Sequence, residues 1–353
     1  MYATVKEFEN TTLTGDLEKD IRIFQDIFKK DSVFRVKKIK VRNAVSFNAA
    51  VLYLDGMVDS TQLDDGVIRP LITVNRENAS PSLADFVETQ ILFARDVKKQ
   101  TKVSDMLNGI MFGEAIVLLE GSREALDVDT KGFKTRGIDE PEDERVLLGP
   151  REGFVENALS NIALIRRKLQ TPDLCSETMR VGRRSNTQIY ICYLESLADP
   201  KLVKRVKEKI KKIDIDGILD TNYITENIRE HKYSVFKTSG TTERPDVVAG
   251  KLLEGRIAII VNGSPVAVTL PYLFSENFQS DEDYYLNFLV SSVGRMLRYI
   301  SFFLAVSIPA VFIALSSFHR ELLPTALAIS VSGLRGGVPF SPLTECLIMI
   351  FVF

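Results

Sequence analysis

The chain has 353 residues, which at about 150 residues per domain corresponds to two or three folded units. Its 45 Lys and Arg residues nearly balance 47 Asp and Glu residues, so no net field attracts nucleic acid and we expect no nucleic-acid partner. The three cysteines, Cys175, Cys192 and Cys346, have the spacing of neither a disulfide framework nor a zinc site. Apolar residues are concentrated towards the end of the chain.

Residues 1–135 predict a first α/β lobe. The first 20 residues carry acidic side chains and no apolar segment, so we expect neither a signal peptide nor a transit peptide, and a cytoplasmic N-terminus. Leu17, Ile21, Phe24 and Phe28 have the spacing of an amphipathic helix. We expect strands over 33–42 and 47–54, and a closing hairpin over 115–128 with Gly-Ser in its turn.

Residues 136–150 are acidic, contain two prolines and lack an apolar period, which indicates a linker. Residues 151–275 predict a second α/β lobe with strands over 178–183 and 188–194 and a closing hairpin over 257–270. Residues 113–128 match 255–270 at an offset of 142, and Tyr53-Leu54 matches Tyr193-Leu194 at an offset of 140. The fold class predicted is therefore α/β: two related mixed α/β lobes, from an internal duplication, followed by an α-helical membrane region.

A search for chemistry finds no catalytic, cofactor or metal site. The two histidines are far apart in sequence, and no phosphate-binding loop or nucleophile elbow is present. Residues 214–220 resemble a calcium loop, but Thr225 stands where the last acidic ligand belongs. We interpret them as a turn in which Gly217 closes one helix and Asp220 caps the next.

Basic residues form two kinds of candidate contact. The helix predicted over 200–212 has seven basic residues against one glutamate, and its basic face either contacts anionic lipid or is a solvated outer face. The pairs Arg166-Arg167 and Arg183-Arg184 are candidate interaction or coupling residues. They would bind a carboxylate or the acidic surface of a partner, or else pair with acidic neighbours.

The end of the chain predicts a membrane region over 299–353, after a juxtamembrane segment over 276–298. Residues 299–318 are 20 uncharged residues, enough for one span. Residues 322–342 are expected to form a re-entrant or interfacial segment, and 343–353 the start of a second span, so that the chain is a fragment. Arg335 and Glu345 are candidate coupling residues facing an assembly or a water-filled path, although Glu345 near the headgroups is the alternative.

Several motifs together resemble the A subunit of the spore germinant receptors, the GerA family. They cover residues from about 145 to 353 and more weakly the first lobe. The motifs lie at 149–154, 161–167, 181–185, 212–220, 243–246, 253–256, 279–284, 318–319 and 337–340. Where the family commonly has Arg-Glu-Gly before Val-Pro-Phe-Pro, this chain has Arg335-Gly336-Gly337 before Val338-Pro339-Phe340-Ser341.

The resemblance implies a non-catalytic subunit of a nutrient germinant receptor that couples nutrient sensing to ion release, as an oligomeric ion pathway. It also implies a multi-pass protein of the spore inner membrane, with a cytoplasmic N-terminal region, membrane lipid around it, and B and C subunits as partners. A membrane transporter component and a membrane-tethered enzyme are the alternatives. The sequence names neither the nutrient nor the stoichiometry, nor whether a small molecule binds between the lobes.

Overall fold

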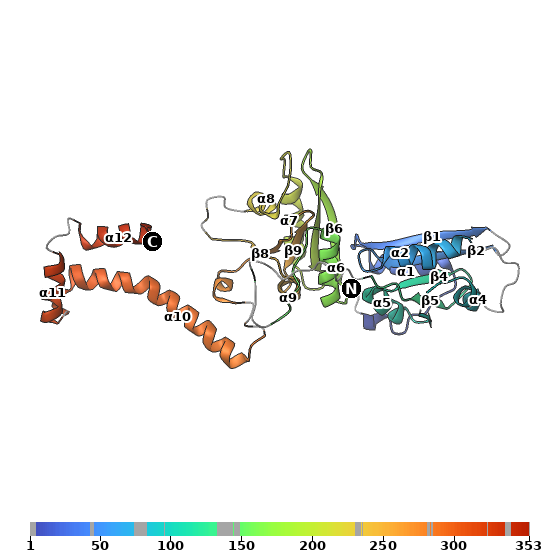
Figure 1. Cartoon of the computed structure of the whole chain (residues 1–353), viewed down its shortest axis with the longest axis horizontal. Helices are drawn as coiled ribbons and strands as arrows, with labels where there is room; N and C mark the ends of the chain where they lie inside the picture. The colour runs from blue at the N-terminus through green and yellow to red at the C-terminus, as the bar shows by residue number, and fades with distance from the viewer. Residues whose placement is uncertain are drawn as a thin grey trace. The chain divides into compact units, whose positions relative to one another are not determined.

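The structure is a computed structural model that describes residues 5–42, 46–73, 83–94, 96–132, 144, 149–229, 234, 236–280, 283, 285–322, 324–335 and 340–352. The chain divides into two compact units, residues 1–274 and residues 275–353. Each unit is described by itself (Figure 1). The predicted linker over 136–150 lies almost wholly outside the described residues, and the proposed domain boundaries stay a prediction.

The first lobe is built on a five-stranded antiparallel sheet of order β1-β2-β4-β5-β3. The strands are β1 (Phe34–Arg42), β2 (Ser46–Leu54), β3 (Val97–Gln100), β4 (Ala115–Leu119) and β5 (Ala125–Val128). One face is covered by α1 (Leu17–Ile27) and α5 (Val103–Phe112). The other is covered by α2 (Ser60–Leu63), the π-helical η2 (Asp64–Ile68), α3 (Arg69–Thr73) and α4 (Leu83–Gln90), while the 3-10 turn η1 (Val5–Phe8) precedes α1.

The second lobe repeats this plan with the order β6-β7-β9-β10-β8. Its strands are β6 (Leu174–Val181), β7 (Thr187–Leu194), β8 (Gly240–Thr242), β9 (Ile257–Val261) and β10 (Ala267–Leu270), all in antiparallel pairs. Helices α6 (Ala158–Lys168) and α9 (Pro245–Leu253) cover one face, and α7 (Pro200–Lys211) and α8 (Thr221–Ile228) the other. Strand β6 begins four residues before the predicted 178.

The two sheets confirm the predicted duplication and fold class. In each, the strands stand in the order first, second, fourth, fifth and third, so hairpins β4–β5 and β9–β10 occupy the same position. The matched glycines behave alike, since Gly113 and Gly255 have φ of 89° and 81° after a helix. Asp59 and Asp199, which stand at the same offset of 140 as Tyr53 and Tyr193, both cap helices, α2 and α7, by accepting hydrogen bonds from the first turn.

The inner strands β4 and β9 are apolar on both sides because each sheet lies between two helix layers. In β2, Ala50 and Leu52 pack in the central core, whereas Ala49 and Val51 pack under α2, η2, α3 and α4, as the two-residue period of a strand requires. The central core is shared, because it contains buried residues of α1 and α5 together with those of α6 and α9. The lobes are therefore joined by one continuous apolar interior.

The motifs at 181–185 and 212–220 lock together at one end of the second lobe. The backbone N–H groups of Arg183 and Arg184 donate to the carbonyls of Ile215 and Asp216, at 2.9 and 2.8 Å. The Ser185 hydroxyl accepts from the Ile218 N–H at 3.1 Å. Asp220 caps α8 as predicted, but α7 already ends at Lys211, so Gly217 packs against Ser185 and does not close that helix.

The second unit contains one helix long and apolar enough to cross a membrane, among the described residues. Helix α10 (Phe288–Ile313) has 26 residues, and its apolar segment is not buried. It begins 11 residues before the predicted span because Asn287 caps it, and a π-helical turn, η5 (Ala314–Phe318), follows it. A 3-10 turn, η3 (Phe274–Phe278), precedes α10, and another, η6 (Arg320–Leu322), follows η5. Helices α11 (Thr325–Arg335) and α12 (Pro342–Val352) complete the unit. Whether 322–342 is re-entrant stays a prediction, since residues 336–339 lie outside the described part.

A candidate coupling site between the two lobes

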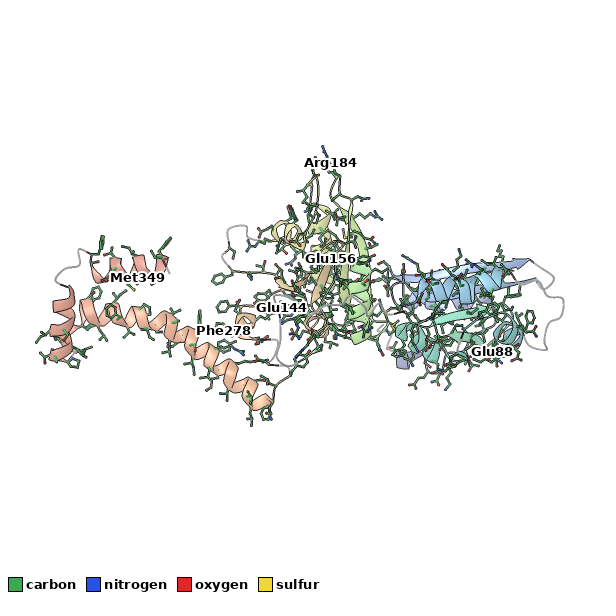
Figure 2. The ribbon with its side chains drawn as sticks, in the orientation of Figure 1. Glu88, Glu144, Glu156, Arg184, Phe278 and Met349 are labelled. Carbon is green, nitrogen blue, oxygen red and sulfur yellow. The ribbon has the colours of Figure 1, made fainter. Side chains whose placement is uncertain are left out.

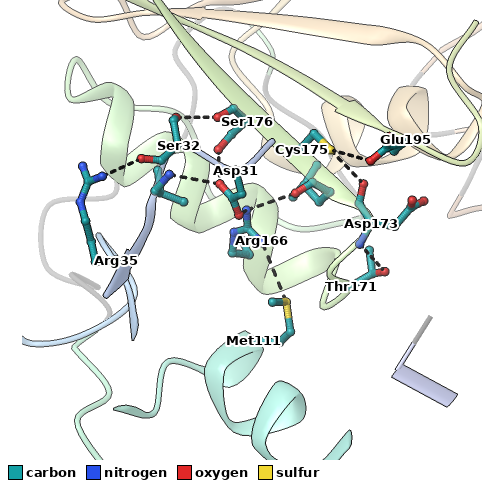
Figure 3. Close-up of polar contacts among 12 residues, drawn as sticks. Asp31, Ser32, Arg35, Met111, Arg166, Thr171, Asp173, Cys175, Ser176 and Glu195 are labelled. Carbon is teal, nitrogen blue, oxygen red and sulfur yellow. Dashed lines mark hydrogen bonds and ion pairs between the residues drawn. The ribbon is translucent and has the colours of Figure 1, made fainter. Parts of the chain in front are cut away.

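A buried ion pair joins the lobes. Asp31 stands between α1 and β1 of the first lobe, and Arg166 lies in the last turn of α6 in the second. Their side chains are 2% and 0% exposed, and an Arg166 Nη2 donates to Asp31 Oδ2 (Figure 3). Asn157 caps the start of α6 by accepting from the Ser160 N–H at 3.1 Å, and Arg166 lies on the buried face of this helix.

Neutral groups complete the surroundings of this pair. The Ser176 hydroxyl donates to Asp31 Oδ1 at 2.6 Å, and the Val33 N–H donates to the same oxygen at 3.2 Å. Arg166 donates to the Leu174 carbonyl at 3.3 Å and contacts the Met111 sulfur at 3.8 Å. Its Nε has no hydrogen-bond partner among the described residues. Removing either charge would leave the other buried without compensation, which is strongly destabilising.

Main-chain hydrogen bonds next to the ion pair also connect the edges of the two sheets. Asp31 forms a parallel bridge with Ser176 of β6. The Ser32 N–H and hydroxyl both donate to the Ser176 carbonyl, at 2.9 and 2.5 Å (Figure 3). The residues just before β1 are therefore tied to the beginning of β6, so the starts of the two edge strands are linked.

A pair of charged residues joins the two lobes at the solvent-exposed edge of the junction. Lys30 pairs with Glu195, and this hydrogen bond raises the pKa of the Lys30 ammonium. Burial raises the pKa of the neighbouring Cys175 thiol to about 12, helped by the Glu195 charge. Because Cys175 stays protonated at neutral pH, it is an inert core thiol and not a nucleophile.

A second polar cluster lies in the first lobe beneath α5. Asp127 is 5% exposed, and burial raises its pKa to about 8, with its hydrogen bond to the neighbouring carboxyl of Glu114 as the next cause. Lys131 pairs with Glu114 at 2.7 Å. Gly109 leaves the space for this carboxyl pair, since a Cβ there would stand 2.7 Å from an Asp127 oxygen. At neutral pH Asp127 is protonated and donates to Glu114.

The structure separates the predicted arginines. Arg166 is internal, whereas Arg167 lies at the surface and pairs with Glu152 at 3.2 Å. Arg183 makes a two-pronged pair with Asp214, with an Nε–Oδ1 distance of 2.5 Å. Arg184 is exposed at the tip of the β6–β7 turn, where no described residue bonds to its side chain (Figure 2).

The two predicted membrane-region residues lie apart from these sites. Arg335 ends α11, and its side chain lies outside the described part. Glu345 is in the first turn of α12 and is half-buried. The described residues contain no group of three or more His, Cys, Asp or Glu side chains placed to hold a metal ion.

Sequence reasoning singled out Arg166 but not its partner Asp31. One signal was present, because Arg166 lies four residues after Ile162 and three before Leu169, on the apolar stripe of α6. A charge on such a stripe needs a buried partner. Nothing local to Asp31 or Ser176 marks them, since their meeting depends on how the lobes pack.

Comparison with known proteins identifies the family. Residues 22–353 match the family described as Bacillus/Clostridium GerA spore germination protein. The chain is 37% identical over 318 residues to spore germination protein KA of Bacillus subtilis (strain 168), covering 90% of this chain and 58% of that protein. It is 36% identical over 303 residues to the uncharacterized membrane protein YfkQ of the same organism, covering 86% and 59%. The chain thus spans somewhat under two thirds of the length of these relatives.

A solved structure extends the comparison to three dimensions. The N-terminal domain of the A subunit of the Bacillus megaterium spore germinant receptor GerK3 matches with a TM-score of 0.57 and 30% identity. The match covers 75% of this chain and 98% of that domain. The fold and the sequence motifs agree, and the chain belongs to the GerA family of spore germination proteins.

Proposed function

We propose that the chain is a non-catalytic subunit of a nutrient germinant receptor in the spore inner membrane, where it couples nutrient sensing to ion release. The observation that carries this proposal is the match of 75% of this chain to the N-terminal domain of a germinant receptor A subunit, over 98% of that domain. The role of a coupling element is supported by the junction between the lobes, where a continuous core and a buried ion pair make the two lobes one body.

The proposal includes the arrangement in the membrane. Helix α10 supplies one crossing, with the two lobes on the cytoplasmic side, and the following helices α11 and α12 belong to a multi-pass region surrounded by lipid. We place B and C receptor subunits as partners, together with further copies of this chain forming an oligomeric ion pathway. Arg184, exposed at the turn between β6 and β7, and Glu345, at the start of α12, are the proposed contact residues for these partners.

A non-enzymatic role agrees with the chemistry of the described residues. The buried thiols of Cys175 and Cys192 both have a pKa raised to about 12 by burial, so neither is activated as a nucleophile. The buried carboxyl of Asp127 is bonded to another carboxyl and not to a histidine or metal.

The test is purification of the tagged chain, expressed from its own locus, from detergent-solubilised spore membranes. We expect integral-membrane and lipoprotein receptor subunits to copurify with it, and a tagged unrelated membrane protein to recover none of them. The chain reconstituted alone in liposomes should not carry nutrients across the bilayer. Nutrient flux by the isolated chain, without copurifying subunits, would contradict the receptor role and support a transporter component.

A further inference from the structure

The residues before α10 fold back onto its first turns through a buried carboxylate. Asp283 belongs to the 279–284 motif, and its side chain is 2% exposed. Arg298 donates to both of its oxygens, from Nη1 to Oδ2 at 2.8 Å and from Nη2 to Oδ1 at 3.0 Å. Arg295 adds a bond from Nε to Oδ2 at 2.9 Å. Both arginines lie on one face of α10, one turn apart.

The backbone of the same segment is tied to the helix as well. The Ser291 hydroxyl donates to the Asp283 carbonyl at 2.8 Å, and Arg298 Nη1 donates to the Phe278 carbonyl at 3.0 Å. Within the segment, the Ser280 N–H donates to Asp283 Oδ2 at 3.2 Å. The carboxylate therefore links the segment to α10 and also fixes the conformation of the segment itself.

An aromatic cluster follows directly after the charged cluster. The Phe278 ring stacks on Tyr299 with centroids 4.4 Å apart, and meets Phe302 edge-on at 5.2 Å. Phe278 is buried at this place and is labelled in Figure 2. We call the described residues of 278–283, with Ser291, Arg295, Arg298, Tyr299 and Phe302, the juxtamembrane clasp.

The clasp lies where the charged part of α10 ends. Arg298 is the last charged residue before 20 uncharged residues, so the ion pair and the aromatic cluster meet at the start of the apolar run. The hydrogen bonds from Arg298 hold the pKa of Asp283 well below its usual range, helped by those from Arg295. The Asp283 carboxylate consequently stays charged, and paired with both arginines, at every physiological pH.

We propose that the juxtamembrane clasp makes α10 a rigid continuation of the segment before it, with Asp283 as the positioning residue. A displacement of residues 278–283 then reaches α10 at Arg298 and Tyr299, at the edge of the apolar run, and is not absorbed by the chain between Asp283 and Asn287. This inference rests on the proposed coupling function, and it assigns a mechanical role to the 279–284 motif.

The rigidity is tested by distances in the chain reconstituted in bilayers. Spin labels are attached at Ser275→Cys and Ser301→Cys in a Cys346→Ser background, because Cys175 and Cys192 are buried. The native clasp predicts one narrow distance distribution, which Asp283→Asn broadens. Glu321→Gln, which removes an exposed carboxylate beyond the far end of α10, is the matched control and should leave it narrow. An unchanged distribution in Asp283→Asn would overturn the clasp.

The mechanical role is tested in spores that carry the complete receptor. Asp283→Asn should reduce the initial rate of nutrient-triggered ion release roughly tenfold or more, with normal membrane insertion and subunit recovery, while Glu321→Gln has no effect. Asp283→Glu retains the charge and should restore part of the rate. Normal release from a variant with a broadened distribution would overturn the positioning role and leave the receptor function standing. Failure of the native chain to support any release would instead overturn the receptor function itself.

Discussion

At the scale of single residues, the Asp31–Arg166 pair holds the lobes together from inside the protein. Arg166→Met removes one charge and leaves Asp31 buried among groups that cannot neutralise it. We expect a loss of about 3–5 kcal/mol in the free energy of unfolding, measured by urea denaturation of the two-lobed unit.

A double-mutant cycle separates the pair from its surroundings. Asp31→Asn keeps the acceptor for Ser176 and Val33 but removes the negative charge. Adding it to Arg166→Met should recover about 1–3 kcal/mol of the loss, since no uncompensated charge then remains. Additive losses from the two substitutions would show that the charges do not interact.

The Asp127 carboxyl predicts an unusual pH dependence of stability. Its pKa rises to about 8 on folding, mainly through burial, with Glu114 adding to the shift and Lys98 and Lys131 opposing it. A carboxyl whose pKa is raised contributes stability that is complete below its unfolded pKa of about 4 and is lost as the pH rises through about 8. Asp127→Asn should therefore stabilise the protein by roughly 1–3 kcal/mol at pH 8–9 and have little effect at pH 4. Equal melting shifts at both pH values would contradict this assignment.

Residue-level prediction from sequence succeeded for the N-terminal cap Asp220 but failed for Gly217, which closes no helix, and for the buried ion pair. Asp220 was recognisable as a cap because its partner lies two residues away, as hydrogen bonding to the Asn222 N–H shows. Asp31 and Arg166 are separated by 135 residues, so only the packing of the lobes brings them together. Buried polar partners of this kind follow from tertiary structure and leave no local pattern.

At the scale of elements, the turn after β2 approaches α6 too closely to accept a side chain. Gly56 has φ of +84°, and a Cβ there would stand 2.9 Å from Leu159 Cγ and 3.2 Å from its carbonyl oxygen. Gly121 has φ of +80° but no atom within 4 Å of a Cβ, so it is a matched control for backbone strain alone. We expect Gly121→Ala to cost about 1 kcal/mol and Gly56→Ala about 1–3 kcal/mol more, by chemical denaturation. Equal losses of stability in the two variants would show that the contact between Gly56 and Leu159 relaxes without a cost in free energy.

The boundaries of helices and strands were predictable where an apolar sequence pattern ends at turn-forming residues. Both closing hairpins combine an apolar strand with a Gly-Ser turn, and β4–β5 and β9–β10 formed where predicted. Helix α10 was predicted too short because its first turns contain arginines. Those charges are neutralised by Asp283, which belongs to a separate segment, so local composition could not show that the helix already extends through them.

At the scale of the whole molecule, the shared core predicts that the two lobes unfold together. Residues 1–274 form one compact unit, and its central core draws on helices of both lobes. Expressed alone, they should be soluble and show a single calorimetric transition with equal calorimetric and van't Hoff enthalpies. Two resolved transitions would contradict the rigid coupling of the lobes.

The internal duplication was the global feature most open to sequence reasoning. A constant offset between matched segments is independent of how the lobes pack, and the common strand order confirms it. The shared core was not predictable, because each amphipathic helix shows only that it buries one face and not which neighbour covers that face. Helix α6, for example, packs its stripe in a core that includes residues of the first lobe.

The proposed coupling of nutrient to ion release is tested most directly by potassium efflux from spores that lack this chain and every other member of its family. Reintroducing the native chain together with its receptor partners should restore nutrient-triggered efflux, and the same partners without the chain should give none. Efflux of equal rate and nutrient dependence from spores with and without the chain would contradict the account.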